Sequence, residues 1–148
     1  MRAQHIFRKA VLPALAACLL GAAGSAWGAA AQWEQVDENP DHSIFFYDKA
    51  SVTRPAPGII RVWARVVYTP EGKADTLQVL KDPVYQGLAE SRFLYDLDCA
   101  GNRSQLRQVV HQDATGKTLK EFNLVGKAGW EETPSASRLD FIAIEECP

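Results

Sequence analysis

The sequence predicts an α+β domain in which an antiparallel β-sheet of about six strands carries a C-terminal helix on one face. Three observations support this prediction. Between residues 33 and 125, apolar and polar side chains mostly alternate, which is the period of a half-buried strand. After Thr133 the apolar residues recur every three or four positions, as on one face of a helix. Two cysteines, Cys99 and Cys147, fall in these two parts of the chain and offer a covalent link between them.

Six segments have the composition and alternation of strands, and turn-forming residues separate them. Strands joined by short turns pair most simply with their neighbours in sequence, which predicts a meander. Residues 37–41 are expected to form a turn, residues 48–52 a bend or one short helical turn, and residues 113–116 a hairpin turn. The expected strands are residues 33–36, 43–47, 59–68, 91–99, 103–112 and 118–125.

The segment Ile59–Tyr68 is the strongest strand, because it has ten residues with no glycine or proline and many β-branched side chains. Its alternation places Val62 on one face. The opposite face carries Arg61, Trp63 and Arg65, so that face is expected to be at least partly in contact with water.

The cysteines give one long-range contact. In the strand 91–99, the alternation directs Cys99 toward the core. Near the C-terminus, Thr133 is expected to cap a helix that begins with Pro134. The apolar face of this helix would carry Leu139, Ile142, Ala143 and Cys147. The sequence therefore predicts a Cys99–Cys147 disulfide that ties the terminal helix to the sheet.

Residues 69–90 form a long connection between the two clearest strands. Connections of this length inside a small domain are usually functional or mobile. Leu77, Val84 and Tyr85 are more apolar than a solvated loop requires. Three interpretations stay open for this segment, namely a covering flap, an extra strand or a contact surface, and we expect it to be a binding element.

The first 28 residues have the layout of a secretory signal peptide. Arg2, Arg8 and Lys9 precede an apolar run, and small residues follow it. Cleavage is expected after a residue between 28 and 31. An alternative is a lipoprotein cut before Cys18, where the residues 15–18 resemble a lipobox and the cysteine would be acylated. Either cut leaves Cys99 and Cys147 as the two remaining thiols, and an oxidising compartment favours their pairing.

Residues 29–148 are expected to form a single domain of ordinary size. This part of the chain has 13 basic and 18 acidic residues, which gives a formal net charge of −5. A mildly acidic domain without a basic stripe is a poor candidate for a nucleic-acid partner. No segment after the signal is apolar enough to span a bilayer.

No catalytic constellation, metal-ligand set or cofactor motif is visible in the sequence, so no enzyme activity, metal or cofactor is expected. His5 belongs to the expected signal, and the two remaining histidines, His42 and His111, are expected to face solvent. Asp96 and Asp98 lie two apart on one strand face, where they would keep that face wet or hold a cation. Arg61, Trp63 and Arg65 form a candidate binding surface for an anionic or protein ligand, although pairing with Asp96 or Asp98 would explain both arginines without a ligand.

The order of the landmarks resembles the surface-adhesin protein E family of Gram-negative bacteria. The most specific of them are the Tyr-x-x-Asp-Cys string and the distant C-terminal cysteine. The landmarks are Tyr47-Asp48, Ser51-Val52, Val62-Trp63, Ser91, the string Tyr95-Asp96-Leu97-Asp98-Cys99, Gly116, Trp130, Pro134-Ser135 and Cys147. The resemblance implies a curved antiparallel sheet with a C-terminal helix held to its concave side by a disulfide.

The resemblance also implies a function. The best-known member of the family is a surface lipoprotein adhesin that binds host extracellular-matrix proteins and haem and that dimerises; no binding residue transfers to this chain. We therefore expect an exported, non-enzymatic binding or structural module in the periplasm or on the outer envelope surface, with a protein partner or a small ligand and with dimerisation as one option. The alternatives are a periplasmic carrier of a small ligand of haem type and, less favoured, an envelope hydrolase.

Overall fold

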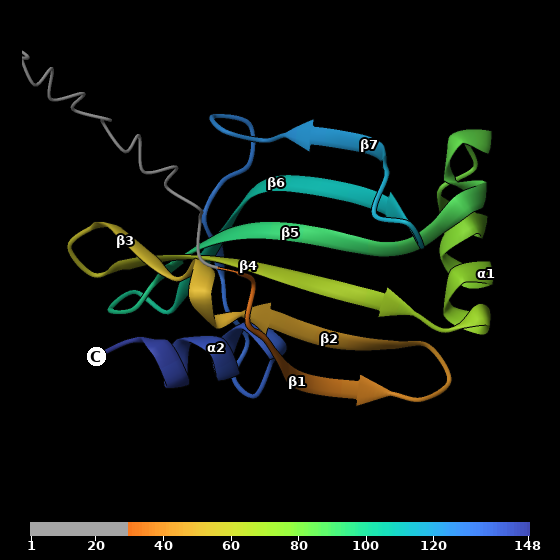
Figure 1. Ribbon diagram of the computed structural model, residues 1–148. Coiled ribbons are helices and arrows are strands. Elements are labelled where there is room, and N and C mark those ends of the chain that lie inside the picture. The colour runs from red at the N-terminus through yellow and green to blue at the C-terminus, as the bar shows by residue number, and fades with distance from the viewer. Residues whose placement is uncertain (1–29) are drawn as a thin grey trace, which may run out of the picture.

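The computed structural model describes residues 30–148, which form one open antiparallel sheet with one helix across the end of its strands and another near its C-terminus (Figure 1). The expected signal peptide and Cys18 lie outside the described residues. The main path of the sheet has the order β1-β2-β4-β5-β6-β7, so the predicted six-stranded meander is confirmed. These strands are β1 (Trp33–Asn39), β2 (Ser43–Asp48), β4 (Ile59–Tyr68), β5 (Leu88–Asp98), β6 (Arg103–Asp113) and β7 (Thr118–Asn123).

Two short strands lie beside this path. β3 (Thr53–Ala56) pairs with β4, and β8 (Glu131–Glu132) pairs with the start of β6. A short 3₁₀ helix, η1 (Lys49–Ser51), connects β2 to β3 at the predicted helical turn. The first strand is longer than predicted, because residues 37–39 continue the pairing with β2 after a bulge and the turn follows at Pro40.

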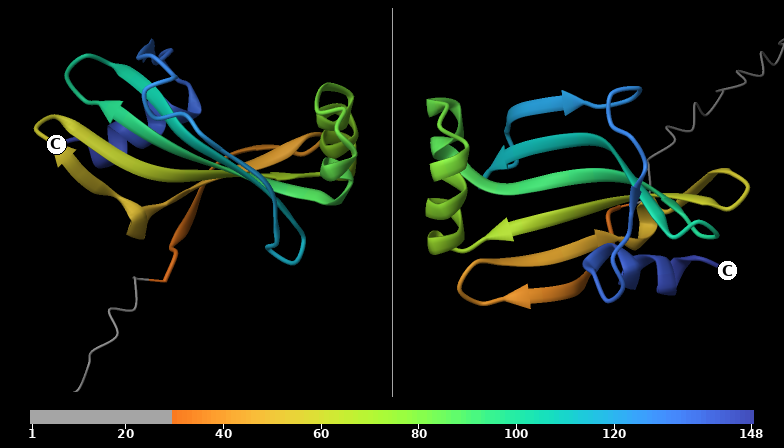
Figure 2. Two further views of the ribbon diagram at one scale, coloured as in Figure 1. Left: turned by 90° about the horizontal axis from the view of Figure 1, so that it is seen from above. Right: turned by 180° about the vertical axis from the view of Figure 1, so that it is seen from behind.

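The C-terminal helix α2 (Arg138–Glu146) packs on one face of the sheet (Figure 2). Ile142 of this helix is fully buried in the core between helix and sheet. Packing of this kind stabilises a helix that would be marginal alone. The buried core consists of Phe45, Tyr47, Ile60, Val62, Ala64, Leu97 and Ile142.

The predicted Cys99–Cys147 disulfide is present, with the two Cα atoms 5.7 Å apart. Cys147 follows the last turn of α2, and its backbone N–H donates to the carbonyl oxygen of Ala143. The disulfide therefore joins the end of the helix to the end of β5. Tyr47 adds a second link, because its hydroxyl donates to Oε1 of Glu146 at 2.8 Å.

The predicted start of the helix was wrong. α2 begins at Arg138, and its N-cap is Ser137, whose side chain accepts from the backbone N–H of Asp140. Ala136 has a φ of 59°, and this left-handed conformation interrupts any helix that would begin at Pro134. Thr133 is buried and donates its backbone N–H to Asn102, so it holds the approach to the helix against the β5–β6 turn.

Residues 69–90 contain a helix that the sequence did not predict, and they add no strand of their own before β5. Helix α1 (Pro70–Val79) is capped by Thr69, and the 3₁₀ helix η2 (Pro83–Gly87) is capped by Asp82. Gly72 lies against the backbone of His42, which anchors the first turn of α1 to the β1–β2 turn. In residues 30–148, no helix has the length and apolar character needed to cross a membrane.

Candidate functional site

The face of the sheet opposite α2 carries most of the candidate site residues. Strand alternation puts Arg61, Trp63 and Arg65 of β4 on this face, as predicted, and the register of β4 with β5 places Asp96 and Arg92 beside them. We call this surface the arginine face. It is made up of Trp33, Arg61, Trp63, Arg65, Glu90, Arg92, Asp96 and Arg107.

Asp96 organises one end of the arginine face. Arg61 donates to both of its oxygens, from Nε at 2.7 Å and from Nη2 at 2.9 Å. Arg107 approaches the same carboxylate, with Nη1 3.1 Å from Oδ2. The hydrogen bonds to Asp96 raise the pKa of Arg61. The predicted pairing of Arg61 with Asp96 is therefore confirmed, and the prediction of a solvated Asp96 was wrong, because the residue is only 4% exposed.

Glu90 organises the other end. Its Oε1 accepts from Nε of Arg92 at 2.6 Å, and its Oε2 lies 3.6 Å from Nη1 of Arg65. The guanidinium of Arg65 lies over two aromatic rings, with its carbon 4.3 Å from the centroid of Trp33 and 4.8 Å from that of Phe46. Burial lowers the pKa of Arg65. The negative charge of Glu90 raises this pKa, and the positive charge of the neighbouring Arg92 lowers it. Glu90 and Asp96 hold the four guanidinium groups of the face, and two further carboxylates lie close by, Asp48 near Arg65 and Glu121 on Gln108, so the charges of the face largely offset one another.

Asp98 does not belong to this arrangement. It forms a separate ion pair with Arg103, whose Nη2 lies 2.7 Å from Oδ2, and it also accepts from the backbone N–H groups of Ala100 and Gly101. These contacts lower the pKa of Asp98, the bond from Arg103 contributing most. Within residues 30–148, no group of three or more His, Cys, Asp or Glu side chains could hold a metal ion.

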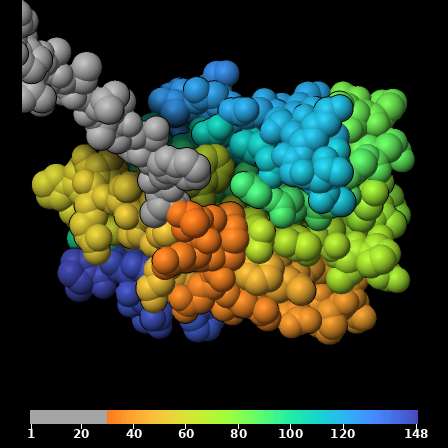
Figure 3. All heavy atoms as spheres, viewed as in Figure 1, coloured from red at the N-terminus to blue at the C-terminus, as the bar shows by residue number. Residues whose placement is uncertain are grey.

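A small pocket opens on the arginine face, with a volume of about 270 Å³. Two tryptophans and Arg92 line it, together with amide side chains from β6. The carbonyl oxygen Oε1 of Gln112 is buried and has no hydrogen-bond partner within residues 30–148. The lining residues are Ala31, Trp33, Asp48, Trp63, Arg92, Gln108, Val110 and Gln112. In Figure 3, which shows this side, the side chains of β5 lie between those of β1 (orange) and β7 (blue).

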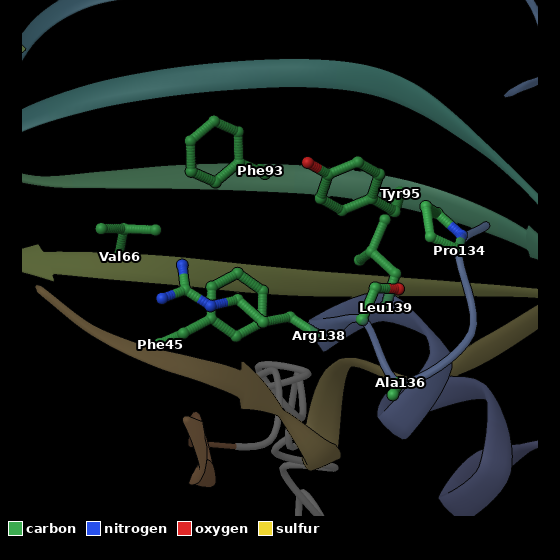
Figure 4. Close-up of a pocket in the computed structure, with 9 residues that line it drawn as sticks. Phe45, Val66, Phe93, Tyr95, Pro134, Ala136, Arg138 and Leu139 are labelled. Atoms are coloured by element: carbon green, nitrogen blue, oxygen red, sulfur yellow. The ribbon is translucent and has the colours of Figure 1, made fainter. Parts of the chain in front are cut away.

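A larger groove lies on the opposite face, between the sheet and the segment that leads into α2 (Figure 4). Its volume is about 560 Å³, and most of its wall is apolar. Phe93 and Tyr95 stack beside each other with ring centroids 6.2 Å apart. Arg138 lies over the ring of Phe45 and pairs with Asp37 at 2.7 Å. The groove is lined by Phe45, Val66, Phe93, Tyr95, Pro134, Ala136, Ser137, Arg138 and Leu139.

The apolar residues of the 69–90 segment do not form one surface. Leu77 is half-buried on α1, and Val84 is 39% exposed. Tyr85 is 4% exposed, because its ring packs edge-on against His111 at a centroid distance of 5.1 Å. This segment therefore covers one end of the sheet, and Tyr85 is part of the interior.

A buried polar cluster was missed in the sequence. His111 was expected to face solvent, but it is 8% exposed. Its Nδ1 lies 2.7 Å from Oγ of Ser91, which also accepts from the hydroxyl of Tyr68 at 3.0 Å. Ser91 is fully buried, so no substrate can reach the hydroxyl as a nucleophile. A bulge interrupts the alternation of β6 where this strand pairs with β5. The sequence pattern therefore does not show that Ser91 and His111 lie opposite each other, and the register of the two strands does.

The comparison with known families gives one match. The model of the family described as surface-adhesin protein E matches residues 33–147, which include the whole sheet, α2 and both disulfide cysteines. No curated protein and no solved structure matches the chain.

Proposed function

The chain belongs to the surface-adhesin protein E family, and from this premise we propose that it acts as an exported, non-enzymatic, adhesin-like binding module of the cell envelope. The observation that carries the proposal is the family match over residues 33–147. We further propose that its partner is a protein of the host extracellular matrix or of the envelope. The disulfide supports export, because such bonds persist in oxidising compartments.

The arginine face is the surface that we propose for partner binding. Arginine and tryptophan are the residue types that contribute most to binding at protein interfaces. Trp63 and Arg92 lie on this face, away from α2, and both are partly exposed. The face thus combines flat aromatic surface with guanidinium groups, which can donate hydrogen bonds to a partner.

Export and binding are tested separately. The intact mass and the N-terminus of the protein in periplasmic and outer-membrane fractions should show a chain that begins after a residue between 28 and 31. A chain that begins at an acylated Cys18 would support the lipoprotein alternative, and an unprocessed cytoplasmic chain would contradict export.

Binding is tested with the mature protein on an immobilised, reconstituted extracellular matrix and with an envelope extract. Arg92→Glu should reduce capture, because it removes a partly exposed guanidinium from the face and places a second carboxylate beside Glu90. Arg103→Glu is the matched control, since Arg103 also pairs with a carboxylate and lies over a tryptophan ring, 5.6 Å from the centroid of Trp130. Equal capture by both variants would contradict the proposed surface.

The groove beneath α2 supports a second candidate function, that of a carrier for a small ligand of haem type. Its volume and its aromatic walls lie in the range of sites that bury small ligands. Titration with haem should give a saturable change in haem absorbance. Phe93→Asp would abolish it, whereas Val79→Asp, at a position 80% exposed on α1, would leave it unchanged. Haem absorbance that never saturates would exclude this candidate.

A further inference from the structure

The open edge of the sheet at β1 has a groove beside it that belongs neither to the arginine face nor to the larger apolar groove. β1 is the first strand of the sheet and pairs with β2, and within residues 30–148 no strand lies against its outer edge. Helix α2 lies next to β1 on the face away from the arginine face (Figure 2). We call the space between these two elements the edge groove, and its volume is about 190 Å³.

The edge groove has walls of mixed apolar and acidic character. Its floor consists of side chains that belong to the core, Tyr47 and Ile142. On α2, Phe141 is 50% exposed and Ile144 is 66% exposed. These two residues lie three positions apart and therefore on one side of the helix, so α2 presents apolar surface to water beside the open strand. The walls are formed by Glu34, Gln35 and Val36 of β1 and by Phe141 and Glu145 of α2.

The face that carries α2 has a surplus of negative charge near this groove. Two carboxylates there are already paired, Glu34 with Lys49 at 3.4 Å and Asp37 with Arg138 at 2.7 Å. Glu145 is exposed and forms no ion pair within the described residues. The third cation, Arg54, donates to the backbone oxygen of Glu146 at 3.0 Å. Three cations therefore face five carboxylates, which are Glu34, Asp37, Asp140, Glu145 and Glu146.

The carboxylates of both walls act on one point in the floor of the edge groove. The hydroxyl of Tyr47 donates to Oε1 of Glu146 at 2.8 Å. Burial raises the pKa of this hydroxyl, and the bond to Glu146 raises it as well. The negative charges of Glu34 on β1 and Glu145 on α2 raise the same pKa further. The two walls thus place negative charge close enough together to act on a single group.

An edge strand with a side-chain pocket beside it is suited to bind an extended peptide. A peptide that adds to a sheet edge gains affinity from main-chain hydrogen bonds, and pockets for its alternate side chains give specificity. A lysine or arginine side chain matches the edge groove. Its aliphatic part can lie along Phe141 and Val36 while its charged end stays at the carboxylates of the rim.

The charges of β1 favour a basic partner over a second copy of the same strand. β1 carries Glu34, Asp37 and Glu38 and no basic residue. Antiparallel pairing of two β1 strands would bring these carboxylates together, and like charges on paired strands are destabilising. Charged side chains on an edge strand discourage such self-pairing. The same charges are complementary to a strand that carries lysine or arginine.

We propose that β1 and the edge groove bind an extended basic segment of a partner protein. The segment pairs with β1 as an added strand, places one lysine or arginine side chain in the groove and lays an apolar side chain against Phe141 and Ile144. This inference goes beyond the proposed function, because it assigns a second surface, on the other face of the sheet, and gives its partner a different chemistry.

The test uses the mature, oxidised, ¹⁵N-labelled protein and three capped peptides that match the seven residues of β1 in length. The first peptide is Lys-Val-Lys-Thr-Lys-Val-Lys, and the second has glutamate at each lysine position. The third keeps the lysine sequence but carries N-methyl groups on alternate residues, which remove backbone donors without changing the charge. We expect the first peptide to shift the amide signals of residues 33–39 and 141–145 in a saturable way and to leave those of β7 in place. The other two should bind at least about tenfold more weakly.

Two pairs of variants test the proposed contacts. Glu145→Lys should weaken binding of the lysine peptide about tenfold, because it reverses an unpaired charge at the groove. Glu121→Lys is its control, since it makes the same change in net charge at an exposed position on the opposite edge strand and should leave the affinity unchanged. Phe141→Ser should weaken binding about fivefold, whereas Val125→Ser, at a position 54% exposed, should have no effect. Melting temperatures of all four variants show that each is folded.

Three results would overturn the inference. Equal affinity for the lysine peptide and its N-methylated form would mean that charge alone attracts the peptide and that no strand is added. Equal weakening by Glu145→Lys and Glu121→Lys would mean that the groove is not the binding site. Shifts in both β1 and β7 that grow with protein concentration in the absence of peptide would place a second copy at this edge.

The result is independent of the proposed function. Capture on matrix or by an envelope partner is expected to depend on Arg92, which lies on the other face, and should be unchanged in Glu145→Lys. Peptide binding should likewise be unchanged in Arg92→Glu. Loss of both activities in either variant would show that the two surfaces are not separate, and it would overturn the assignment of a second surface.

Discussion

The hydroxyl of Ser91 lies 2.7 Å from Nδ1 of His111 in the interior of the sheet. Ser91 also accepts from the hydroxyl of Tyr68, and with a neutral imidazole it can donate its own proton to an unprotonated Nδ1, which closes a chain of hydrogen bonds. Tyr85 and Phe122 pack edge-on against the imidazole. Burial in these surroundings therefore favours the neutral histidine.

This preference for the neutral form predicts a loss of stability in mild acid. Burial lowers the pKa of His111 below its ordinary value of 6.5, and the charge of Lys120 lowers it further. Because the unfolded chain binds this proton more readily, the contribution of the neutral histidine is complete above about pH 6.5 and is lost as the pH falls through the lowered value. We expect the melting temperature to decline between pH 7.5 and pH 5.

The control for this prediction is His111→Gln, measured over the same pH range. The variant should be less stable than the parent at pH 7.5 and should show a shallower decline toward pH 5. The carboxylates with lowered pKa values, such as Asp98 and Asp113, titrate at lower pH and do not contribute in this window. Parallel curves for the two proteins would show that His111 does not cause the decline.

The disulfide is predicted to hold α2 on the sheet. Cys99 and Cys147 are separated by 48 positions, and closing a loop of this size stabilises a fold by roughly 4 kcal/mol in the chain-entropy model. A helix of nine residues is marginal alone. Reduction, or the double substitution Cys99→Ser with Cys147→Ser, should therefore abolish amide hydrogen-exchange protection in residues 138–147 first, while β4 and β5 stay protected. Unchanged protection of α2 would mean that Ile142 and the Tyr47–Glu146 bond are sufficient to hold the helix.

The sequence predicted those parts of the fold that local pattern determines. The predicted bounds of β4 were correct at both ends. Its ten residues alternate without a break, so one assignment of side chains to the buried and the solvated face fits the whole strand. Helix α2 was placed correctly, but its start was wrong. The Thr133-Pro134 pair has the local features of a helix start, and the left-handed Ala136 that prevents it is not predictable from residue preference. Helix α1 was missed, since its apolar residues do not recur on one face.

The candidate site was predictable only in part. Arg61, Trp63 and Arg65 share a face because of alternation, and the Arg61–Asp96 pair follows from a simple antiparallel register. The small pocket on the arginine face depends on residues from β1, β5 and β6 whose positions are set by two bulges. Those bulges shift the pairing by one residue, so neither Trp33 over Arg65 nor Gln112 beside Arg92 could be inferred from spacing.

Asp96 is predicted to be the most important carboxylate of the arginine face for stability. It is 4% exposed and holds both Arg61 and Arg107. Asp96→Asn would leave two partly buried guanidinium groups without their counter-ion, and we expect a loss of about 2 kcal/mol in the free energy of unfolding, discounted for the partial exposure of the arginines. Urea denaturation measures this loss.

Glu34→Gln is the comparison for Asp96→Asn. Glu34 pairs with Lys49 at 3.4 Å, and both side chains are about half exposed. Surface pairs of this kind contribute little, so the change should stay within about 0.5 kcal/mol. If the two variants lose equal stability, the buried position of Asp96 has no energetic consequence.

Gly72 is predicted to be required by the contact between α1 and the β1–β2 turn. A Cβ atom at this position would lie 1.8 Å from the backbone oxygen of His42, an impossible contact with a group that also accepts from the N–H of Thr69. Gly72→Ala should therefore lower the free energy of unfolding by about 2–3 kcal/mol, although alanine is the better helix former. Gly129→Ala, where a Cβ would meet nothing within 4 Å, should change stability little. Thermal denaturation of both variants checks this, and a Gly72→Ala protein as stable as the parent would show that α1 can move away from the turn without cost.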